Sequence, residues 1–115
     1  MPGFEHFGKE EIKEVNDVLE TGILMRYGFD GPRKGIWKAK ELEAAICETF
    51  GCKHAQLLSS GTAALTTAMS ALGIGYGDEI ILPSFTFVAS FEAVISVGAI
   101  PVFVDVDDTL TLNPT

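Results

Sequence analysis

Three hydroxyl-bearing residues gather around one glycine in the stretch AQLLSSGTAAL, where an apolar run gives way to helix formers. Ser59, Ser60 and Thr62 flank Gly61. The first N–H groups of a helix lack intrahelical partners, and the helix dipole adds positive character there. Gly61 also lets a ligand approach the backbone closely. The stretch therefore predicts a phosphate-sized anion site, although a plain strand–turn–helix with a serine N-cap fits the same residues.

Two phenylalanines stand on a second polar loop, Pro83–Phe87, with the sequence PSFTF. An aromatic side chain beside an anion site can stack on a planar ring of the ligand. We assign Phe85 to the core of the helix that follows. For Phe87 both interpretations remain open, a ring that stacks on a ligand and a core side chain.

The glycine-rich run Gly73–Glu79, GIGYGDE, does not fit a dinucleotide-binding motif. Its spacing is G-x-G-x-G, and it joins a predicted helix to a predicted strand, at the end of the sheet opposite the ligand edge. The Gly-Lys-Ser/Thr of a phosphate loop is absent as well. An anion site with an aromatic neighbour then favours pyridoxal 5'-phosphate over a nucleotide.

The elements that must position these residues alternate regularly in the second half of the chain. We expect three strands and two helices in the order His54–Leu58, Thr62–Leu72, Glu79–Leu82, Phe87–Val97 and Ile100–Val106. The strands are continuous apolar runs, which is typical of strands covered on both faces. Such alternation predicts an α/β fold, β-α-β-α-β with parallel strands. Ligands bind beyond the carboxyl ends of such strands, so both polar loops lie at that edge.

Helices are predicted on either side of an irregular, glycine-punctuated arm in the first half of the chain. The first spans Gly8–Thr21 and the second Trp37–Phe50. We expect the second helix to bury one side, made up of Leu42, Ala45, Ile46 and Phe50. Five of the eight basic residues lie in or just after the arm: Arg26, Arg33, Lys34, Lys38 and Lys40. This clustering fits a solvated loop, or contact with an anionic ligand or a neighbouring subunit.

Composition excludes several classes of protein. A net charge of −8 argues against nucleic-acid binding, which needs a basic surface. No apolar run is long enough for a membrane span, and the charged N-terminus does not fit a secretory signal. Cys47 and Cys52 have no His or Cys partners at metal-ligand spacing, so we expect no metal site. We expect a cytoplasmic protein.

The sequence resembles the DegT/DnrJ/EryC1/StrS family in three motifs that occur in the same order, SSGTAAL, ALGIGYGDEIILPSFTFVAS and VGAIPVFVDVDDTLTLNP. The opening GKEEIKEVNDVLETGIL is similar to the N-terminal helix and arm of that family. Its members are fold-type-I, pyridoxal-phosphate-dependent aminotransferases, many of which act on nucleotide-linked keto-sugars. The resemblance implies one partial large domain, with residues 1–53 as helices and arm and 54–115 as β-α-β-α-β.

The resemblance also implies roles for individual residues. Gly61 and Thr62 would contact the phosphate of pyridoxal 5'-phosphate (PLP), and Phe87 would stack on its pyridine ring. We add Ser60 to Gly61 and Thr62 as part of the same predicted phosphate cradle. Arg26, Tyr27 and Arg33 are candidates for contacts with the substrate's phosphates. The implied activity is amino transfer from an amino acid, glutamate in our interpretation, to a keto-sugar in sugar biosynthesis. We expect the enzyme to be a homo-oligomer, a dimer, with no membrane or nucleic-acid partner.

The family's Schiff-base lysine, and the aspartate that pairs with its pyridine nitrogen, have no counterpart in these residues. None of the lysines follows a predicted strand at the ligand edge. We therefore expect an incomplete part of the enzyme, a fragment that alone is inactive and binds PLP weakly or not at all. Alternatives are a non-catalytic interaction module derived from an aminotransferase, and a fragment of a PLP-dependent sugar dehydratase. The open edges of three parallel strands also predict that the isolated chain associates with itself or is only marginally stable in solution.

Overall fold

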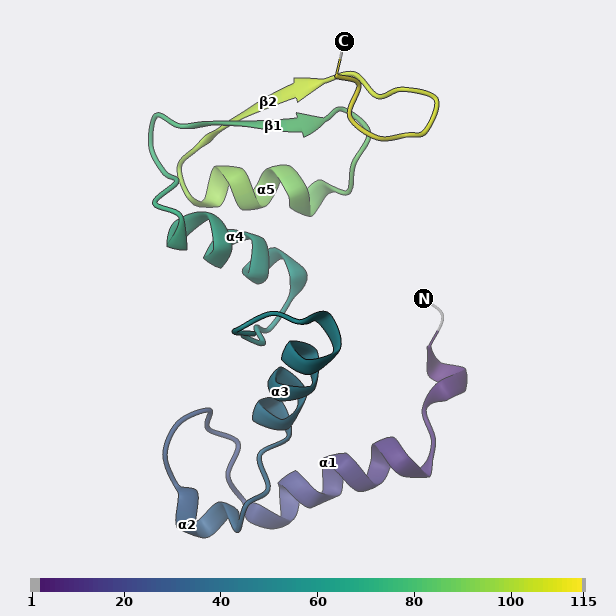
Figure 1. Ribbon diagram of the computed structural model, residues 1–115, viewed down its shortest axis with the longest axis vertical. Coiled ribbons are helices and arrows are strands. Elements are labelled where there is room, and N and C mark those ends of the chain that lie inside the picture. Colours follow the sequence, from purple (N-terminus) through teal and green to yellow (C-terminus); the bar gives the residue numbers. More distant parts are fainter. Residues whose placement is uncertain (1–2, 115) are drawn as a thin grey trace. The chain divides into compact units, whose positions relative to one another are not determined.

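The computed structural model describes residues 3–114 and divides into two compact units, Met1–Gln56 and Leu57–Thr115. The first holds the 3-10 turn η1 (Phe4–His6) and the helices α1 (Lys9–Thr21), α2 (Asp30–Arg33) and α3 (Lys38–Phe50) (Figure 1). The second holds α4 (Gly61–Ala71), β1 (Glu79–Pro83), α5 (Val88–Ser96) and β2 (Ile100–Val104). The mixed α/β class with parallel strands is confirmed.

Helix α1 is bounded by glycines at both ends. The Gly8 N–H donates to the Glu11 carboxylate at 2.7 Å, which caps the first turn. Gly22 ends the helix in the left-handed conformation (φ 67°), a position that suits a residue without Cβ. The apolar side chains of this helix, Ile12, Val15 and Leu19, are all at least half exposed.

The predicted buried side of α3 is wrong in this structure. Leu42 is 50% exposed and Phe50 77% exposed, Ala45 is exposed, and Ile46 is only partly covered. Ion pairs join α1 to Lys38, the first residue of α3, and they leave the apolar side of α3 exposed. Lys38 Nζ lies 2.6 Å from a Glu14 carboxylate oxygen and 3.4 Å from one of Asp17. In the described part of this unit no element packs closely over the apolar side of α3.

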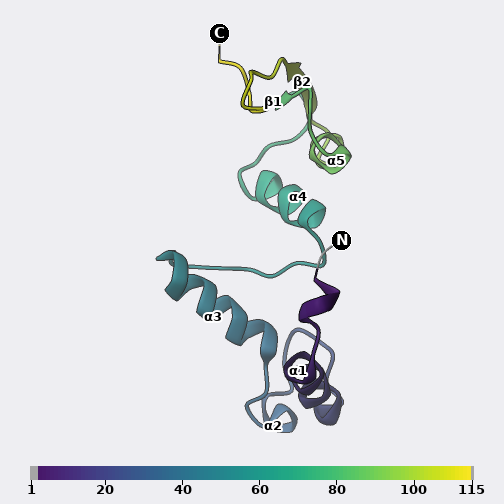
Figure 2. The same cartoon turned by 90° about the vertical axis from the view of Figure 1, so that its right-hand side faces the viewer.

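The second unit is built as layers on a parallel pair of strands. β1 and β2 pair in register from Glu79 opposite Ile100 to Pro83 opposite Val104. Figures 1 and 2 show α5 along one face of this pair, with α4 on the far side of α5. The small core forms where α5 meets the strands, at Ala93, Val94 and Ala99. The other face of the pair is open, and Ile81 on it is 62% exposed.

One of the three expected strands is missing from the described residues. His54–Leu58 forms neither strand nor helix, whereas β1 and β2 pair with each other. A strand exists only through hydrogen bonds to a neighbour, which an apolar run cannot supply by itself. The segment also crosses the boundary between the two units.

The last strand is shorter than predicted. It ends at Val104, and Val106 instead forms an isolated antiparallel bridge with Leu112. The chain reverses between them: the Asp107 N–H donates to the Thr111 carbonyl at 3.1 Å, and the Leu110 N–H to the Asp107 carbonyl at 2.9 Å. In the described part of the chain, no helix has the length and apolar character that crossing a membrane requires.

Candidate functional site

Helix α4 begins at Gly61, one residue earlier than predicted, with Ser60 as its N-cap. The Ser60 hydroxyl oxygen accepts from the Ala63 N–H at 3.1 Å, and its carbonyl accepts from the Ala64 N–H at 3.0 Å. The serine cap and the anion site are therefore compatible interpretations of one stretch. The Ser60 hydroxyl caps the helix. The backbone amides of Gly61 and Thr62, which lie between the cap and Ala63, are not used by this cap.

The N–H groups of Gly61 and Thr62 take part in none of the hydrogen bonds found among residues 3–114. They are the first-turn donors that a helix leaves unsatisfied. A Cβ placed on Gly61 would meet nothing within 4 Å, so the space beside these donors is open. They stand at the positive end of an eleven-residue helix, where backbone N–H groups commonly bind anions in proteins.

A hollow of about 650 Å³ lies beside this helix start. From α4 it is lined by Gly61 and Thr62, and from the start of α5 by Phe87 and Ser90. The remaining lining residues are Ala64, Leu65, Ala68 and Ala89. The volume is in the range of small-molecule sites, and small side chains on α4 leave room between the two helices. The structure thus brings three of the four predicted cofactor residues to one hollow, and Ser60 precedes them directly.

The phenylalanine at this hollow is largely free of the protein core. Phe87 is 76% exposed and occupies the N-cap position of α5. Its exposure favours a ring available to a ligand over a core side chain. The expectation for Phe85 is wrong, because this side chain is 66% exposed. It lies in the bend after β1, and the core contacts of α5 come from Ala93 and Val94 further along.

Ser90 was not among the predicted site residues, although it lines the hollow. Its Oγ lies 2.9 Å from Thr86 Oγ1, and its N–H donates to the Phe87 carbonyl at 2.9 Å. The sequence could have indicated this contact, because Thr86 and Ser90 are hydroxyl residues four positions apart. The mainly apolar sequence of the helix drew the interpretation toward core residues instead.

The arm residue Arg33 is buried, with 5% of its surface exposed. Its Nε donates to the Gly28 carbonyl at 3.0 Å, and an Nη donates to the Met25 carbonyl. The guanidinium also lies 4.5 Å from the centre of the Trp37 ring. These contacts hold the arm in a closed loop, so Arg33 has a structural role here.

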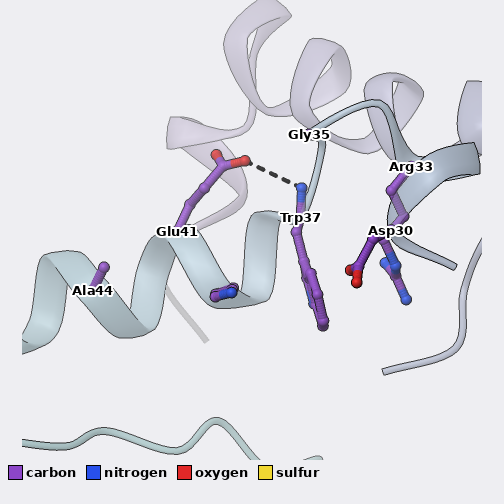
Figure 3. A pocket seen from close by; sticks show the side chains of 7 residues that line it. Asp30, Arg33, Gly35, Trp37, Glu41 and Ala44 are labelled. Carbon is purple, nitrogen blue, oxygen red and sulfur yellow. Dashed lines mark hydrogen bonds between the residues drawn. The ribbon is translucent and has the colours of Figure 1, made fainter. Parts of the chain in front are cut away.

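A hollow of about 390 Å³ lies beside Arg33 and Trp37 (Figure 3). Its charged lining is mixed: Asp30 and Glu41 stand with Arg33 and Lys40. The Trp37 N–H donates to Glu41 at 3.2 Å, which is the bond drawn in Figure 3. Such mixed charge defines no single class of ligand.

The other two arm residues differ in exposure. Arg26 donates to a Glu43 carboxylate oxygen at 2.5 Å, and this bond raises the pKa of the Arg26 guanidinium above its ordinary value. Tyr27 is 74% exposed. Tyr27 is therefore the most accessible of the three predicted substrate contacts. These residues belong to the first unit, and the hollow beside α4 belongs to the second.

No group of three or more His, Cys, Asp or Glu residues comes together as a metal site within residues 3–114. Cys47 and Cys52 are both free thiols. Burial raises the pKa of the Cys47 thiol, so this sulfur is a poor thiolate donor at neutral pH.

The chain belongs to the DegT/DnrJ/EryC1/StrS aminotransferase family, whose model matches residues 5–115. Solved structures of the same fold support this assignment. A Streptococcus pneumoniae protein assigned as a sugar aminotransferase, in its PLP form, is 35% identical, with a TM-score of 0.79. DesV from S. venezuelae, in complex with a ketimine intermediate, is also 35% identical, with a TM-score of 0.81. The E. coli GDP-4-keto-6-deoxy-D-mannose-3-dehydratase with bound hydrated PLP is 26% identical, with a TM-score of 0.75.

The match covers most of this chain but a small part of each relative. It includes 93% of this chain and 25% of the S. pneumoniae protein, and 96% of this chain and 28% of DesV. For the dehydratase the shares are 93% and 27%. The chain thus spans about a quarter of the length of these relatives.

Proposed function

We propose that this chain provides the phosphate- and ring-binding part of a PLP-dependent aminotransferase that acts on a keto-sugar. The observation that carries the proposal is the hollow where the unused amides of Gly61 and Thr62 meet the exposed ring of Phe87. Membership of the aminotransferase family and 35% identity to a sugar aminotransferase in its PLP form support it.

The residues present fit the cofactor. The amides of Gly61 and Thr62 would bind the phosphate, and the missing Cβ of Gly61 allows its close approach. Ser60 fixes the helix start through its cap, and Phe87 would cover a ring face and exclude water from it. When bound, PLP supplies an electron sink for cleavage of bonds at the amino-bearing carbon.

We further propose a nucleotide-linked keto-sugar as substrate and an amino acid such as glutamate as donor. Tyr27 and Arg26 are the proposed contacts to the substrate's phosphates, since Arg33 is buried against two carbonyls. Sugar dehydration is the second candidate, favoured by the similarity to the E. coli dehydratase. We rank amino transfer first because the chain is 26% identical to the dehydratase and 35% identical to the protein assigned as a sugar aminotransferase.

The proposal separates binding from amino transfer. The Schiff base between enzyme and cofactor is formed with a lysine, and no lysine is among the residues that line the hollow beside α4. We propose that the 115 residues alone bind the cofactor weakly and do not catalyse amino transfer. We also propose a cytoplasmic homo-oligomer, with the exposed apolar sides of α1 and α3 as interface candidates.

A titration with pyridoxamine 5'-phosphate tests the binding proposal, because this amine form of the cofactor does not condense with surface lysines. We expect the backbone amide resonances of Gly61 and Thr62 to shift in NMR spectra of the chain. Pyridoxamine without the phosphate should leave them in place. The absence of shifts at these two amides with pyridoxamine phosphate would contradict the proposal.

Gly61→Ala separates ligand binding from folding. Apart from its chain neighbours and the backbone of its own helix, the added methyl meets no protein atom within 4 Å, so stability should hold, but it enters the space proposed for the phosphate. We expect the shift at Thr62 to weaken strongly. Gly31→Ala is the matched control, because a Cβ there also meets nothing within 4 Å and it lies in the other unit.

A further inference from the structure

Two hydrogen bonds from one residue hold the segment that carries the Phe87 ring. Ser90 Oγ lies 2.9 Å from Thr86 Oγ1, and the Ser90 N–H donates to the Phe87 carbonyl at 2.9 Å. The first bond fixes the residue before the phenylalanine, and the second fixes the phenylalanine's own carbonyl. Ser90 therefore bonds both the residue that precedes Phe87 and the backbone carbonyl of Phe87 itself.

The ring itself has little other support. Phe87 is 76% exposed, so packing contributes little to its position. As the N-cap of α5 it also offers no side-chain acceptor to the first turn. Helix starts usually rely on a Ser, Thr, Asp or Asn at that place. Here the hydroxyl of Thr86, one residue earlier, and that of Ser90 close the turn between them.

We propose that Ser90 and Thr86 form a hydroxyl clamp that positions the Phe87 ring at the hollow for the ring of the bound cofactor. This inference rests on the proposed function and adds two positioning residues to it. Holding the loop in its binding conformation lowers the conformational entropy lost when a ligand binds. Ser90 also lines the hollow, so the clamp lies at the site it would organise.

Hydrogen exchange in the free chain tests the clamp without any ligand. Thr86→Val and Ser90→Ala each remove one hydroxyl and leave the Ser90 N–H in place. We expect exchange of the Ser90 amide to rise by about 2- to 10-fold in both variants, the range set by one net hydrogen bond. Ser90→Thr keeps the hydroxyl and should restore protection. Unchanged exchange in Thr86→Val and Ser90→Ala would overturn the clamp.

Ser96→Ala is the matched control on the same helix. Its hydroxyl donates to the Glu92 carbonyl at 2.7 Å near the other end of α5. This variant should leave exchange at the Ser90 amide unchanged. An equal rise in exchange would show general loosening of the helix and overturn the positioning role.

Paired titrations with pyridoxamine phosphate and inorganic phosphate test what the clamp does for the ligand. In Ser90→Ala and Thr86→Val we expect affinity for pyridoxamine phosphate to fall about 2- to 10-fold, with unchanged affinity for inorganic phosphate. The double variant should lose no more than either single one, since both remove the same bond. Equal loss for both ligands would show a merely structural role. If the unaltered chain binds neither ligand, the proposed function is overturned, and so is the role of the clamp in ligand binding. The hydrogen-exchange result decides separately whether the clamp exists.

Discussion

The Ser60 hydroxyl oxygen accepts a hydrogen bond from the Ala63 N–H at 3.1 Å, across the two residues whose own amides stay unused. One side chain thus satisfies the third N–H donor of α4, while the first two have no hydrogen-bond acceptor among residues 3–114. The arrangement gives Ser60 and Gly61 different tasks. Ser60 caps the start of the helix, and Gly61, which has no Cβ, leaves space beside the amides. It also assigns Ser60 a supporting role at the site.

Removing the cap should destabilise the second unit. We expect Ser60→Ala to lower the free energy of unfolding by about 1 kcal/mol, the usual cost of losing an N-cap side chain. Chemical denaturation followed by circular dichroism measures this change. Ser59→Ala is the control, because Ser59 is exposed and lies outside the helix. An equal effect of both variants would contradict the capping role.

The exposed ring should matter for the ligand and not for the fold. Phe87→Ala is expected to change the free energy of unfolding by no more than about 0.5 kcal/mol, as is usual for surface positions. Affinity for pyridoxamine phosphate should fall, while affinity for inorganic phosphate stays the same. Phe85→Ala removes a similarly exposed ring from the same loop but outside the hollow, so it should alter neither affinity. If only Phe85→Ala reduced the affinity for pyridoxamine phosphate, the ligand's ring would contact Phe85, and the assignment to Phe87 would be contradicted.

Arg33 should prove structural. Replacing it by lysine keeps the charge but removes the planar fork that reaches two carbonyls. We expect Arg33→Lys to lower the stability of the first unit by about 1–3 kcal/mol, measured by denaturation with Trp37 fluorescence. Lys53→Ala, at an exposed position, is the control and should have little effect. If Arg33→Lys unfolded with the same free energy as the unaltered chain, the structural role would be contradicted, and Arg33 would again be a candidate for ligand binding.

The start of α1 should respond to acid. The hydrogen bond from the Gly8 N–H lowers the pKa of Glu11 below its ordinary value of 4.5. A lowered pKa means that the charged form is favoured by folding, so its stabilisation is present above pH 4.5 and is lost as the pH falls through the folded pKa. Helical circular dichroism should therefore decline in this acid range. In Glu11→Gln that part of the decline should disappear; an unchanged profile would contradict the role of Glu11.

Self-association should depend on exposed apolar surface. Ile81 is 62% exposed on the face of the β1–β2 pair that α5 leaves open. We expect sedimentation velocity at micromolar concentration to show association of the chain, and Ile81→Lys to reduce it. Tyr76→Lys, at a fully exposed loop position, is the control. A stable monomer of the unaltered chain would contradict this prediction.

The local elements were predictable because their signals are local. Glycines and hydroxyl residues mark the ends of α1 and α4, and the predicted starts are within one residue of those observed. Strands β1 and β2 also lie where the apolar runs predict them. The strand expected at His54–Leu58 does not form, because pairing depends on a neighbour that a local pattern does not contain.

At the candidate site, the unpaired amides at the start of α4 were predictable from the sequence, and their surroundings were less so. The types and order of Ser60, Gly61 and Thr62 were enough to suggest free amides at a helix start. The burial of Arg33 was not foreseeable, since its partners are backbone carbonyls of Met25 and Gly28, which no residue type reveals. Ser90 escaped notice because its role depends on a hydroxyl one turn earlier.

A crystal structure of the chain with pyridoxamine 5'-phosphate would show directly whether the start of α4 binds the phosphate. We expect phosphate oxygens at hydrogen-bond distance, about 2.7–3.2 Å, from the amide nitrogens of Gly61 and Thr62. We also expect the pyridine ring against the side chain of Phe87. A phosphate bound elsewhere, for example at the basic residues of the arm, with the start of α4 left empty, would contradict this expectation.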